Sequence, residues 1–375
     1  MLQFKENKSN LTLGVEMEVQ LLDSNSLKLT PKAPEIVKRL QHPRLAKEMF
    51  RSTLELVTDV CANVQEVHQD LSEVLELVRL VSREMGIVLA STGTHPIADY
   101  NNRILSPSDR YATLLDRNQW LIKRMAVYGL HVHIGMRNGD ECIRFTNFFL
   151  HFIPHLIALS ASSPFWKGRD TGLAAARPTT YESHPTSGIP IPVADWKAFS
   201  ALYDQFISTG SIQSMKDIWW DLRPSPGYGT LEIRICDAPA TLLELESVVA
   251  WIHLLAAWFE DHQGETTQVY SEPPTNWILR ENKWRAIRYG LDAEIILTDN
   301  LQQKTIRTDI IEWLERLTPY VEEYQYKKYT ENIHQILQFG TSSQRQRRCW
   351  ENTNDLEQVV KWNIREFEKE VPIFG

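Results

Sequence analysis

Cysteine is scarce in this sequence, and its four cysteines are not arranged for a structural role. Cys61, Cys142, Cys236 and Cys349 are scattered along 375 residues without a CxxC pair. This spacing argues against a zinc knuckle and a disulfide scaffold, and it indicates reduced thiols in a cytosol. The first residues also lack the apolar core of a signal peptide. The expected location is therefore the cytoplasm.

Excess positive charge and long apolar runs are missing too. The formal net charge of −8 gives no general attraction to nucleic acid or to an anionic membrane, so neither is expected as a partner. The apolar stretch 148–166 is broken by His151, Pro154 and His155, and the stretch 248–259 is too short to span a bilayer. The composition is that of a soluble globular protein with ample length for a large core.

The common phosphate-binding and nucleophile motifs are absent. The sequence contains no GxxxxGK[ST] motif and no GxGxxG motif after a predicted strand, so a nucleotide would not bind on a P-loop or a dinucleotide fold. No GxSxG motif or cysteine-nucleophile setting is present either. Any handling of phosphate would depend on metal ions and arginines.

What the sequence does contain is a strictly alternating stretch at 14–20. Val15, Met17 and Val19 occupy one face, and Glu16 and Glu18 the other, which predicts a half-buried β-strand. On such a strand the two glutamates lie about 6.6 Å apart at their Cα atoms. Like charges at this separation repel each other unless a cation lies between them. If this face lines a cleft, the pair therefore indicates a metal ion or a cationic substrate.

Three further predicted strands carry ionisable groups on one face. They contribute Glu55, the pair His131 and His133, and the pair Glu232 and Arg234. For any one strand the alternative is a solvated polar face, but four such strands together favour a polar concave surface. Carboxylates with an imidazole suit Mg²⁺ or Mn²⁺, and an arginine can neutralise a phosphate or a carboxylate.

Several of these residues have an equally simple structural interpretation. Either His131 or His133 could be a hydrogen-bonded core histidine instead of a ligand. His95 precedes a proline and is expected to cap a turn, whereas His151 and His155 are expected to be structural. The tryptophan pair at 219–220 is expected in the core, and the basic runs at 280–288 and 345–348 could be solvated helix faces.

The remaining pattern predicts the order of the elements. The pattern at 219–237 predicts a β-hairpin with a Pro/Gly turn. Residues 160–192 show no clear period, which predicts a functional loop or lid. Beyond about residue 265 the chain is expected to be helical and more polar. Helices are expected at 31–40, 64–85, 107–127, 141–159, 196–206 and 242–260.

Taken together, the motifs resemble those of the YbdK-type carboxylate–amine ligases, which are glutamate–cysteine ligase-like enzymes of the glutamine synthetase fold group. The resemblance extends over nearly the whole chain. Its motifs are TLGVExE (12–18), STLELVT (52–58), GTHP (93–96), HVHIG (131–135), SASSP (160–164), WDLRPSPxxGTLEIRICD (220–237), NKWRAIRYGLDA (282–293) and GxxxxRQR (340–347).

The resemblance implies an α+β fold with a curved, mostly antiparallel sheet. Helices would pack on its convex side, and its concave face would hold Mg²⁺, ATP and glutamate. It also implies one ligase domain over 1–375, with a sheet-centred core at 10–262 and a mainly helical part at 263–375. In the implied reaction, the side-chain carboxylate of glutamate attacks the γ-phosphate of ATP, and an amine such as cysteine then displaces phosphate from the acyl phosphate.

Transferred by motif, the resemblance assigns a role to each candidate residue. Arg234 would face the transferring phosphoryl group, and Arg223 and Arg177 would face a substrate carboxylate or a phosphate. His133 falls near a position used for nucleotide or metal contact, and Arg345 and Arg347 would close over the nucleotide. The implied metal ligands are Glu16, Glu18, Glu55, His131 and Glu232.

Two other functions remain open at this point. One is a different metal-dependent phosphotransferase or hydrolase that uses the same face, and the other is a non-catalytic relative that binds ATP with Mg²⁺. The substrates are expected to be small molecules in each case. Fold relatives and the long helical C-terminal third favour a homodimer.

Overall fold

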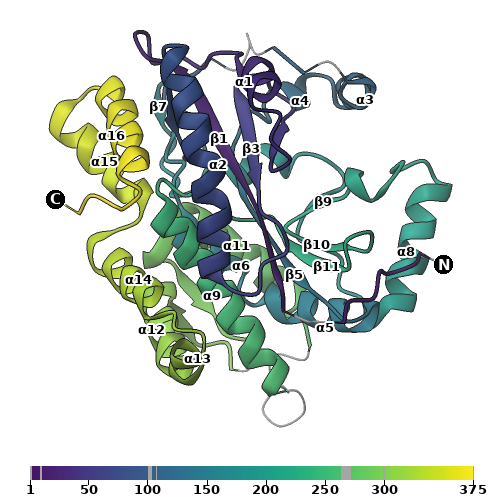
Figure 1. Ribbon diagram of the computed structural model, residues 1–375. Helices are drawn as coiled ribbons and strands as arrows, with labels where there is room; N and C mark the ends of the chain where they lie inside the picture. Colours follow the sequence, from purple (N-terminus) through teal and green to yellow (C-terminus); the bar gives the residue numbers. More distant parts are fainter. Residues whose placement is uncertain are drawn as a thin grey trace.

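The computed structural model describes residues 2–8, 11–99, 104–106, 108–262, 272–298 and 300–374. Among these residues, seven strands form one sheet in the order β10-β11-β5-β1-β3-β2, and β4 pairs with the second half of β1 (Figure 1). All of these pairs are antiparallel. The strands are β1 (Leu13–Asp23), β2 (Leu45–Lys47), β3 (Thr53–Val57), β4 (Ile87–Ala90), β5 (Leu130–Gly135), β10 (Leu222–Ser225) and β11 (Thr230–Ile233).

Strand β1 has the two faces that its alternation predicts. Val15, Met17 and Val19 are at most 2% exposed and belong to the main core, whereas Glu16 and Glu18 on the opposite face are only partly buried. On the neighbouring strands the side chains paired with these residues point to the same side, because antiparallel partners directly opposite each other project to the same face of the sheet. The sheet therefore has one apolar face and one face that carries ionisable groups.

Helices cover the apolar face. Helix α2 (Val64–Glu84) begins after Asn63, whose side chain accepts a hydrogen bond from the backbone of Glu66, and it buries Val67, Leu71 and Val74. It runs along β1 and β3 in Figure 1, with α9 (Leu242–Asp261) beside it. These observations confirm the predicted α+β fold with an antiparallel sheet that is covered by helices on one side.

The apolar segment at 141–159 forms two helices, and the prediction of one continuous helix was wrong. Helices α5 (Gly139–Leu150) and α6 (Ile153–Ser160) are bent by 65° at the break. Pro154 lies in the first turn of α6, where its missing N–H costs no hydrogen bond. Of the helices described, α9 alone is long and apolar enough to cross a bilayer by itself, and 94% of that window is buried inside the fold.

Two other segments also differ from their predicted structure. Residues 107–127 form α3 (Asp109–Asn118) and α4 (Trp120–Lys123), which are separated by Gln119 with a positive φ. The segment 160–192, predicted to be a loop or lid, contains short elements that are anchored to the rest of the fold. These are β6 (Phe165–Trp166), β7 (Arg169–Asp170), α7 (Arg177–Tyr181) and β8 (Ser187–Gly188), of which β8 pairs in parallel with β9 (Trp219–Trp220).

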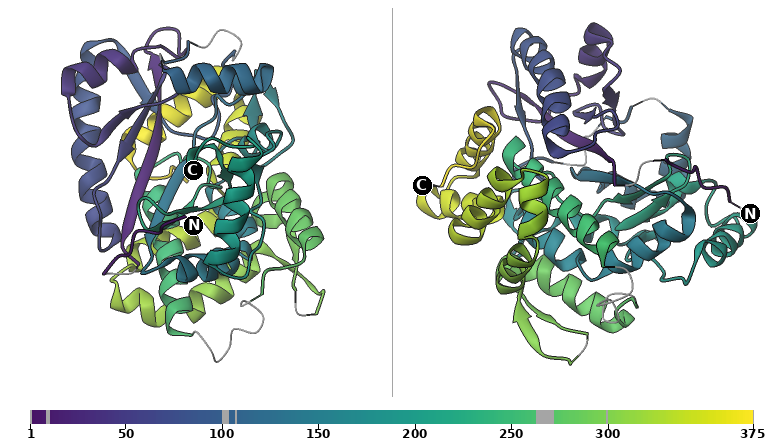
Figure 2. Two further views of the ribbon diagram at one scale, coloured as in Figure 1. Left: turned by 90° about the vertical axis from the view of Figure 1, so that its right-hand side faces the viewer. Right: turned by 60° about the horizontal axis from the view of Figure 1, so that its bottom comes forward.

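The described part of the chain beyond residue 272 is mainly helical, as predicted, although it also contains a small hairpin. In Figure 2 this part lies along one side of the molecule, next to the helical face of the sheet. Its elements are α11 (Asn276–Tyr289), η3 (Gly290–Asp292), β12 (Glu294–Ile296), β13 (Gln303–Thr305), α12 (Ile306–Arg316), α13 (Thr318–Glu323), α14 (Lys327–Phe339), α15 (Ser342–Thr353) and α16 (Leu356–Lys369). The other described elements are α1 (Ala33–Leu40), α8 (Trp196–Ser208) and η2 (Met215–Asp217).

Candidate active site

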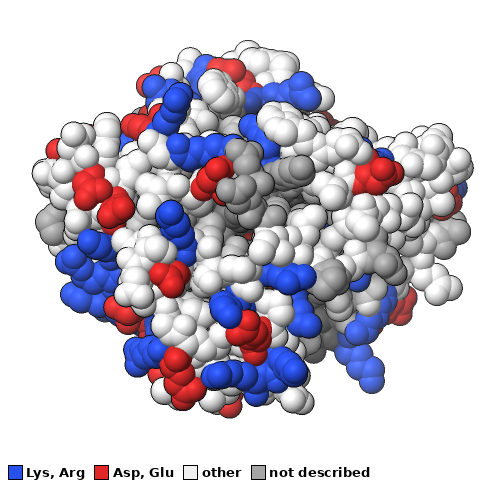
Figure 3. Space-filling view, turned by 90° about the horizontal axis from the view of Figure 1, so that it is seen from above, with Lys and Arg blue, Asp and Glu red and all other residues white. Residues whose placement is uncertain are grey.

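A cavity of about 710 Å³ opens on the polar face of the sheet. Its walls combine ionisable side chains of the strands with aromatic residues and methionines from the surrounding loops and helices. On the face seen in Figure 3, the described acidic and basic side chains are interspersed, and no large patch of one sign is visible there. The ionisable residues that line the cavity are Glu16, Glu18, Glu48, Glu55, His131, Arg177, Lys216, Arg223 and Arg234.

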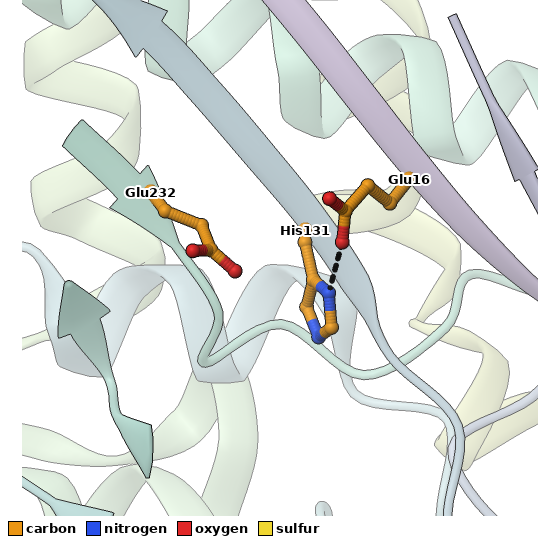
Figure 4. A group of neighbouring side chains, drawn as sticks. All are labelled: Glu16, His131 and Glu232. Atoms are coloured by element: carbon orange, nitrogen blue, oxygen red, sulfur yellow. Dashed lines mark hydrogen bonds and ion pairs between the residues drawn. The ribbon is translucent and has the colours of Figure 1, made fainter. Parts of the chain in front are cut away.

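The first cluster consists of Glu16, His131 and Glu232, which come from β1, β5 and β11. One potential ligand atom from each lies within 4.8 Å of the others, and Figure 4 shows the three side chains converging. The Nδ1–H of His131 donates to Glu16 Oε2 at 2.8 Å, so Nε2 carries the lone pair that can coordinate a metal ion. Two carboxylates and an imidazole form a donor set that suits Mg²⁺ or Mn²⁺.

Burial and hydrogen bonding set the protonation states that this cluster needs. Burial, together with the charge of Arg234, lowers the pKa of His131 to about 4, so its imidazole is neutral at pH 7. Burial alone would raise the pKa of Glu16, but hydrogen bonds from His131 and His133 hold it well below the usual value. A neutral imidazole beside an ionised carboxylate is the combination that can ligate a metal.

Two arginines flank Glu232. Arg223 donates from Nε to Glu232 Oε2 at 2.9 Å, and Arg234 forms an ion pair with the other carboxylate oxygen. Burial would raise the pKa of Glu232, but the charges of Arg234 and Arg223 lower it to about 2. The two guanidinium groups therefore stand beside the first cluster, where they can bind phosphate oxygens.

The second cluster consists of the carboxylates of Glu18, Glu48 and Glu55, with one oxygen from each within 4.8 Å of the others. Glu18 and Glu55 lie directly opposite each other on β1 and β3, and Glu18 accepts a hydrogen bond from the backbone N–H of Gly129 at 2.5 Å. Burial and the charge of Glu48 raise the pKa of Glu18 to about 8, and the same two causes raise that of Glu55 well above its usual value. This mutual repulsion is relieved by a proton or by a cation.

Glu48 was not predicted from the sequence. It lies between the short strand β2 and β3, in a segment without an alternating pattern, and only the folding of this segment back over β3 brings its carboxylate to Glu18 and Glu55. Its proximity to Glu55 in the chain is the one local feature that could have suggested a role.

Arg177 and His133 also lie at this site. Arg177, the first residue of α7, is 5% exposed and donates to the carbonyl oxygens of Arg234 and Ile235. Its Nε is buried and has no hydrogen-bond partner among the described residues, and the side chain lines the cavity, so this N–H is available to a ligand. His133 bonds through Nε2 to Glu16 at 3.3 Å, and the charges of Glu232 and Glu16 raise its pKa although burial opposes this.

The structure does not bring Arg345 or Arg347 to the cavity, and this contradicts their predicted role of closing over the nucleotide. Arg345 is 1% exposed and forms ion pairs with Glu244 at 2.8 Å and with Glu366 at 2.7 Å. Arg347 pairs with Asp170 at 2.7 Å. Residues two apart on a helix project in different directions, so on α15 one arginine enters the core and the other contacts β7.

Lys283 is a second residue that the sequence left unassigned. It lies on α11, is 2% exposed and forms ion pairs with Asp221 at 2.6 Å and with Glu182. Glu182 directly follows α7, which carries Arg177. The predicted basic run at 280–288 therefore includes a buried lysine that ties the C-terminal part of the chain to the back of the cavity wall.

The other histidines and the tryptophan pair lie mostly where the sequence predicts. His95 caps its turn, accepting from the backbone N–H of Ile97 and contacting Leu27 O at 3.0 Å. His155 lies outside the cavity, where it is bonded to Asp309 at 2.7 Å. Trp220 is in the core, as expected, but Trp219 is only half-buried and lines the cavity.

Comparison with known proteins supports the same interpretation. The family model described as glutamate–cysteine ligase family 2 (GCS2) matches residues 12–361. A protein of Bdellovibrio bacteriovorus with the provisional name glutamate–cysteine ligase 2 is 42% identical over 98% of this chain and 97% of its own length. A relative from Thermobifida fusca with the same provisional name is 38% identical and covers 100% of this chain and 95% of its own length.

Two solved structures share the fold. The glutamate–cysteine ligase of Francisella tularensis, in complex with AMP, aligns with a TM-score of 0.73 over 99% of this chain and 91% of its own, at 12% identity. A bifunctional glutathione synthetase from Pasteurella multocida aligns with a TM-score of 0.68 over 96% of this chain and 52% of its own, at 15% identity. At these identities the likeness supports the fold alone.

Proposed function

The chain belongs to glutamate–cysteine ligase family 2, and from this premise we propose that it is an ATP-dependent carboxylate–amine ligase that forms γ-glutamyl amides. In the proposed reaction, an oxygen of the glutamate side-chain carboxylate attacks the γ-phosphorus of ATP, and ADP leaves. The amine nitrogen then attacks the acyl carbon, and phosphate leaves with the electron pair of the C–O bond. The acceptor loses its proton as the amide forms.

The observation that supports this proposal most strongly is the pairing of two donor clusters with arginines inside one cavity. The first cluster fits one divalent cation through Glu16, His131 and Glu232, and the all-carboxylate cluster fits a second. Bound Mg²⁺ would supply positive charge to the phosphate oxygens of ATP. No protein nucleophile is required, because such a reaction depends on positioning and charge neutralisation.

The arginines have separate proposed tasks. Arg234 and Arg223 would stabilise negative charge on the transferring phosphoryl group, since both reach the first cluster at Glu232. Arg177 would bind the α-carboxylate of glutamate through its unpartnered Nε. An unsatisfied buried guanidinium donor is costly, and a bound carboxylate would remove that cost.

Phosphate release from ATP and Mg²⁺ tests the proposal, with L-glutamate and a panel of amines that includes cysteine. The expected result is release that requires both glutamate and an amine, together with a new amide detected by mass spectrometry. ATP binding without release under any amine would support the non-catalytic alternative, and ATP-dependent phosphate release without an amine would support the hydrolase alternative.

Substitutions in each cluster test the metal assignment. Glu55→Gln and Glu232→Gln are each expected to reduce turnover by at least about 10²-fold, because each removes one charged ligand from a site that stabilises developing charge. Glu331→Gln is the matched control, because Glu331 is exposed and, within the described ranges, its carboxylate pairs only with Lys327 on the same helix. Full activity in both cluster variants would rule out the assignment.

A further inference from the structure

Residues 2–8 begin at the wall of the active-site cavity. In Figure 1 the start of the chain lies beside α8, and in the structure Trp196 of that helix donates to Leu2 O at 3.0 Å. The ring of Phe4 packs edge-on against Trp196, with 5.1 Å between the ring centroids. Leu2 and Gln3 both line the cavity. The segment is therefore attached to the wall of the site and contributes to its surface.

The same segment holds the turn between β10 and β11. The backbone N–H of Lys5 donates to Pro226 O at 2.9 Å, and the Asn7 amide donates to Gly229 O at 2.7 Å and to Met136 O at 3.2 Å. Gly229 has φ +71°, and a Cβ atom there would collide with Lys5 O and with the Asn7 amide. The close approach of residues 2–8 to this turn thus requires glycine at position 229.

This turn connects the two strands that carry the charged groups of the first cluster. Arg223 on β10 and Glu232 on β11 are direct cross-strand partners. A nucleotide with its phosphates at Arg223 and Arg234 can extend along β10 to the turn, which begins about 10 Å beyond Arg223 at normal strand rise.

The surface at the turn suits a purine base. Leu2 and Pro226 are apolar, and Tyr228 is 66% exposed, with its ring 5.8 Å from that of His133. Aromatic rings bind bases by stacking. The side-chain amide of Gln3 offers both a donor and an acceptor, which the edge of adenine needs, and it makes no hydrogen bond within the described part of the chain.

We propose that Leu2, Gln3 and Asn7 form part of the nucleotide site: Asn7 fixes the β10–β11 turn, and Leu2 and Gln3 together with this turn enclose the adenine base of ATP. This inference rests on the proposed ATP-dependent function and extends it to a segment outside the sheet. Gln3 contacts the base in this arrangement, and Asn7 acts as a positioning residue through Gly229.

The experiment measures binding of MgADP and of magnesium with inorganic tripolyphosphate by titration calorimetry, which requires no turnover. Asn7→Ala and Gln3→Ala are each expected to weaken MgADP binding by about 5- to 10-fold, as for loss of one or two hydrogen bonds, and to leave tripolyphosphate binding unchanged. In turnover, the KM for ATP should rise while that for glutamate does not. Gln3→Ala should also reduce the preference for ATP over GTP.

Glu6→Ala provides the control, because Glu6 lies in the same segment, is exposed and does not line the cavity. Unchanged MgADP binding in both test variants would overturn the inference, and so would an equal loss of MgADP and tripolyphosphate binding. If the wild-type protein binds MgADP but the variants do not differ from it, only this inference fails. If the wild-type protein binds no MgADP, the proposed function fails as well.

Discussion

Replacing Arg345 with methionine distinguishes a structural arginine from a nucleotide-binding one. The guanidinium group of Arg345 is the only cation that pairs with Glu244 and Glu366 among the described residues. Both carboxylates are almost fully buried, with side-chain exposures of 7% and 0%. Methionine fills a similar volume but leaves these two carboxylates facing each other without a positive charge.

The expected cost follows from the burial of the pair. Removing one partner from a buried ion pair typically costs about 3–5 kcal/mol. With about 2.1 cal/mol/K of unfolding entropy per residue and 375 residues, a loss of about 4 kcal/mol lowers Tm by about 5 °C. Burial and the charge of Glu366 act to raise the pKa of Glu244, and Arg345 opposes them. Without the arginine a carboxyl proton is bound more readily, so the loss should be smaller at pH 5 than at pH 8.

Thermal and urea unfolding measure this loss, and steady-state kinetics measure the KM for ATP on the folded variant. The combined variant with Arg345→Met, Glu244→Gln and Glu366→Gln serves as the matched control, because it removes the charges together and should recover most of the stability. An unchanged KM for ATP is expected. A KM for ATP raised more than tenfold (about 1.4 kcal/mol), without a loss of stability, would refute this reasoning and restore the nucleotide-binding role predicted from the sequence.

Three further substitutions or conditions test the site. Glu48→Gln should weaken Mg²⁺ binding by about 10- to 100-fold in a calorimetric titration, and an unchanged affinity would remove Glu48 from the second cluster. Because burial and Glu48 raise the pKa of Glu18 from 4.5 to about 8, Mg²⁺ must displace a proton, so affinity should increase up to about pH 8 and then level off. Without metal, the folded protein binds the Glu18 proton more tightly than the unfolded chain does, because the pKa is higher in the folded state. The free energy of unfolding should therefore fall as pH rises from 4.5 through 8. A pH-independent urea midpoint would contradict this. Lys283→Met leaves the buried carboxylate of Asp221 without its ion-pair partner. This should lower the free energy of unfolding, measured in urea, by about 3–5 kcal/mol. Adding Asp221→Asn should restore most of that loss.

Much of the polar face could be predicted from the sequence, because strand periodicity is a local property. Glu16 and Glu18 alternate with apolar residues, and so do Glu232 and Arg234. Once the apolar positions are buried against helices, the positions between them must share the opposite face. Antiparallel pairing then places Glu16 opposite His131 and Glu18 opposite Glu55. The motif resemblance added the family and the chemistry expected of this face.

Other predictions could not succeed, because the relevant contacts join distant parts of the chain. The helical pattern at 342–353 indicates that its arginines lie on different sides of a helix, but only the packing of α15 against α16 and α9 buries Arg345 beside Glu244. Lys283 resembles the exposed arginines of its basic run until α11 packs against the loop that carries Asp221.

The sequence by itself thus determined the two-faced sheet, five of the six candidate metal ligands and the family. The tertiary structure alone decided that Glu48 completes the second cluster, that Arg345 belongs to the core, and that residues 2–8 contact the β10–β11 turn. The physical reason is that alternation fixes which face of an element is apolar. Which distant charge meets that element depends instead on how the whole chain packs, and no local pattern encodes this.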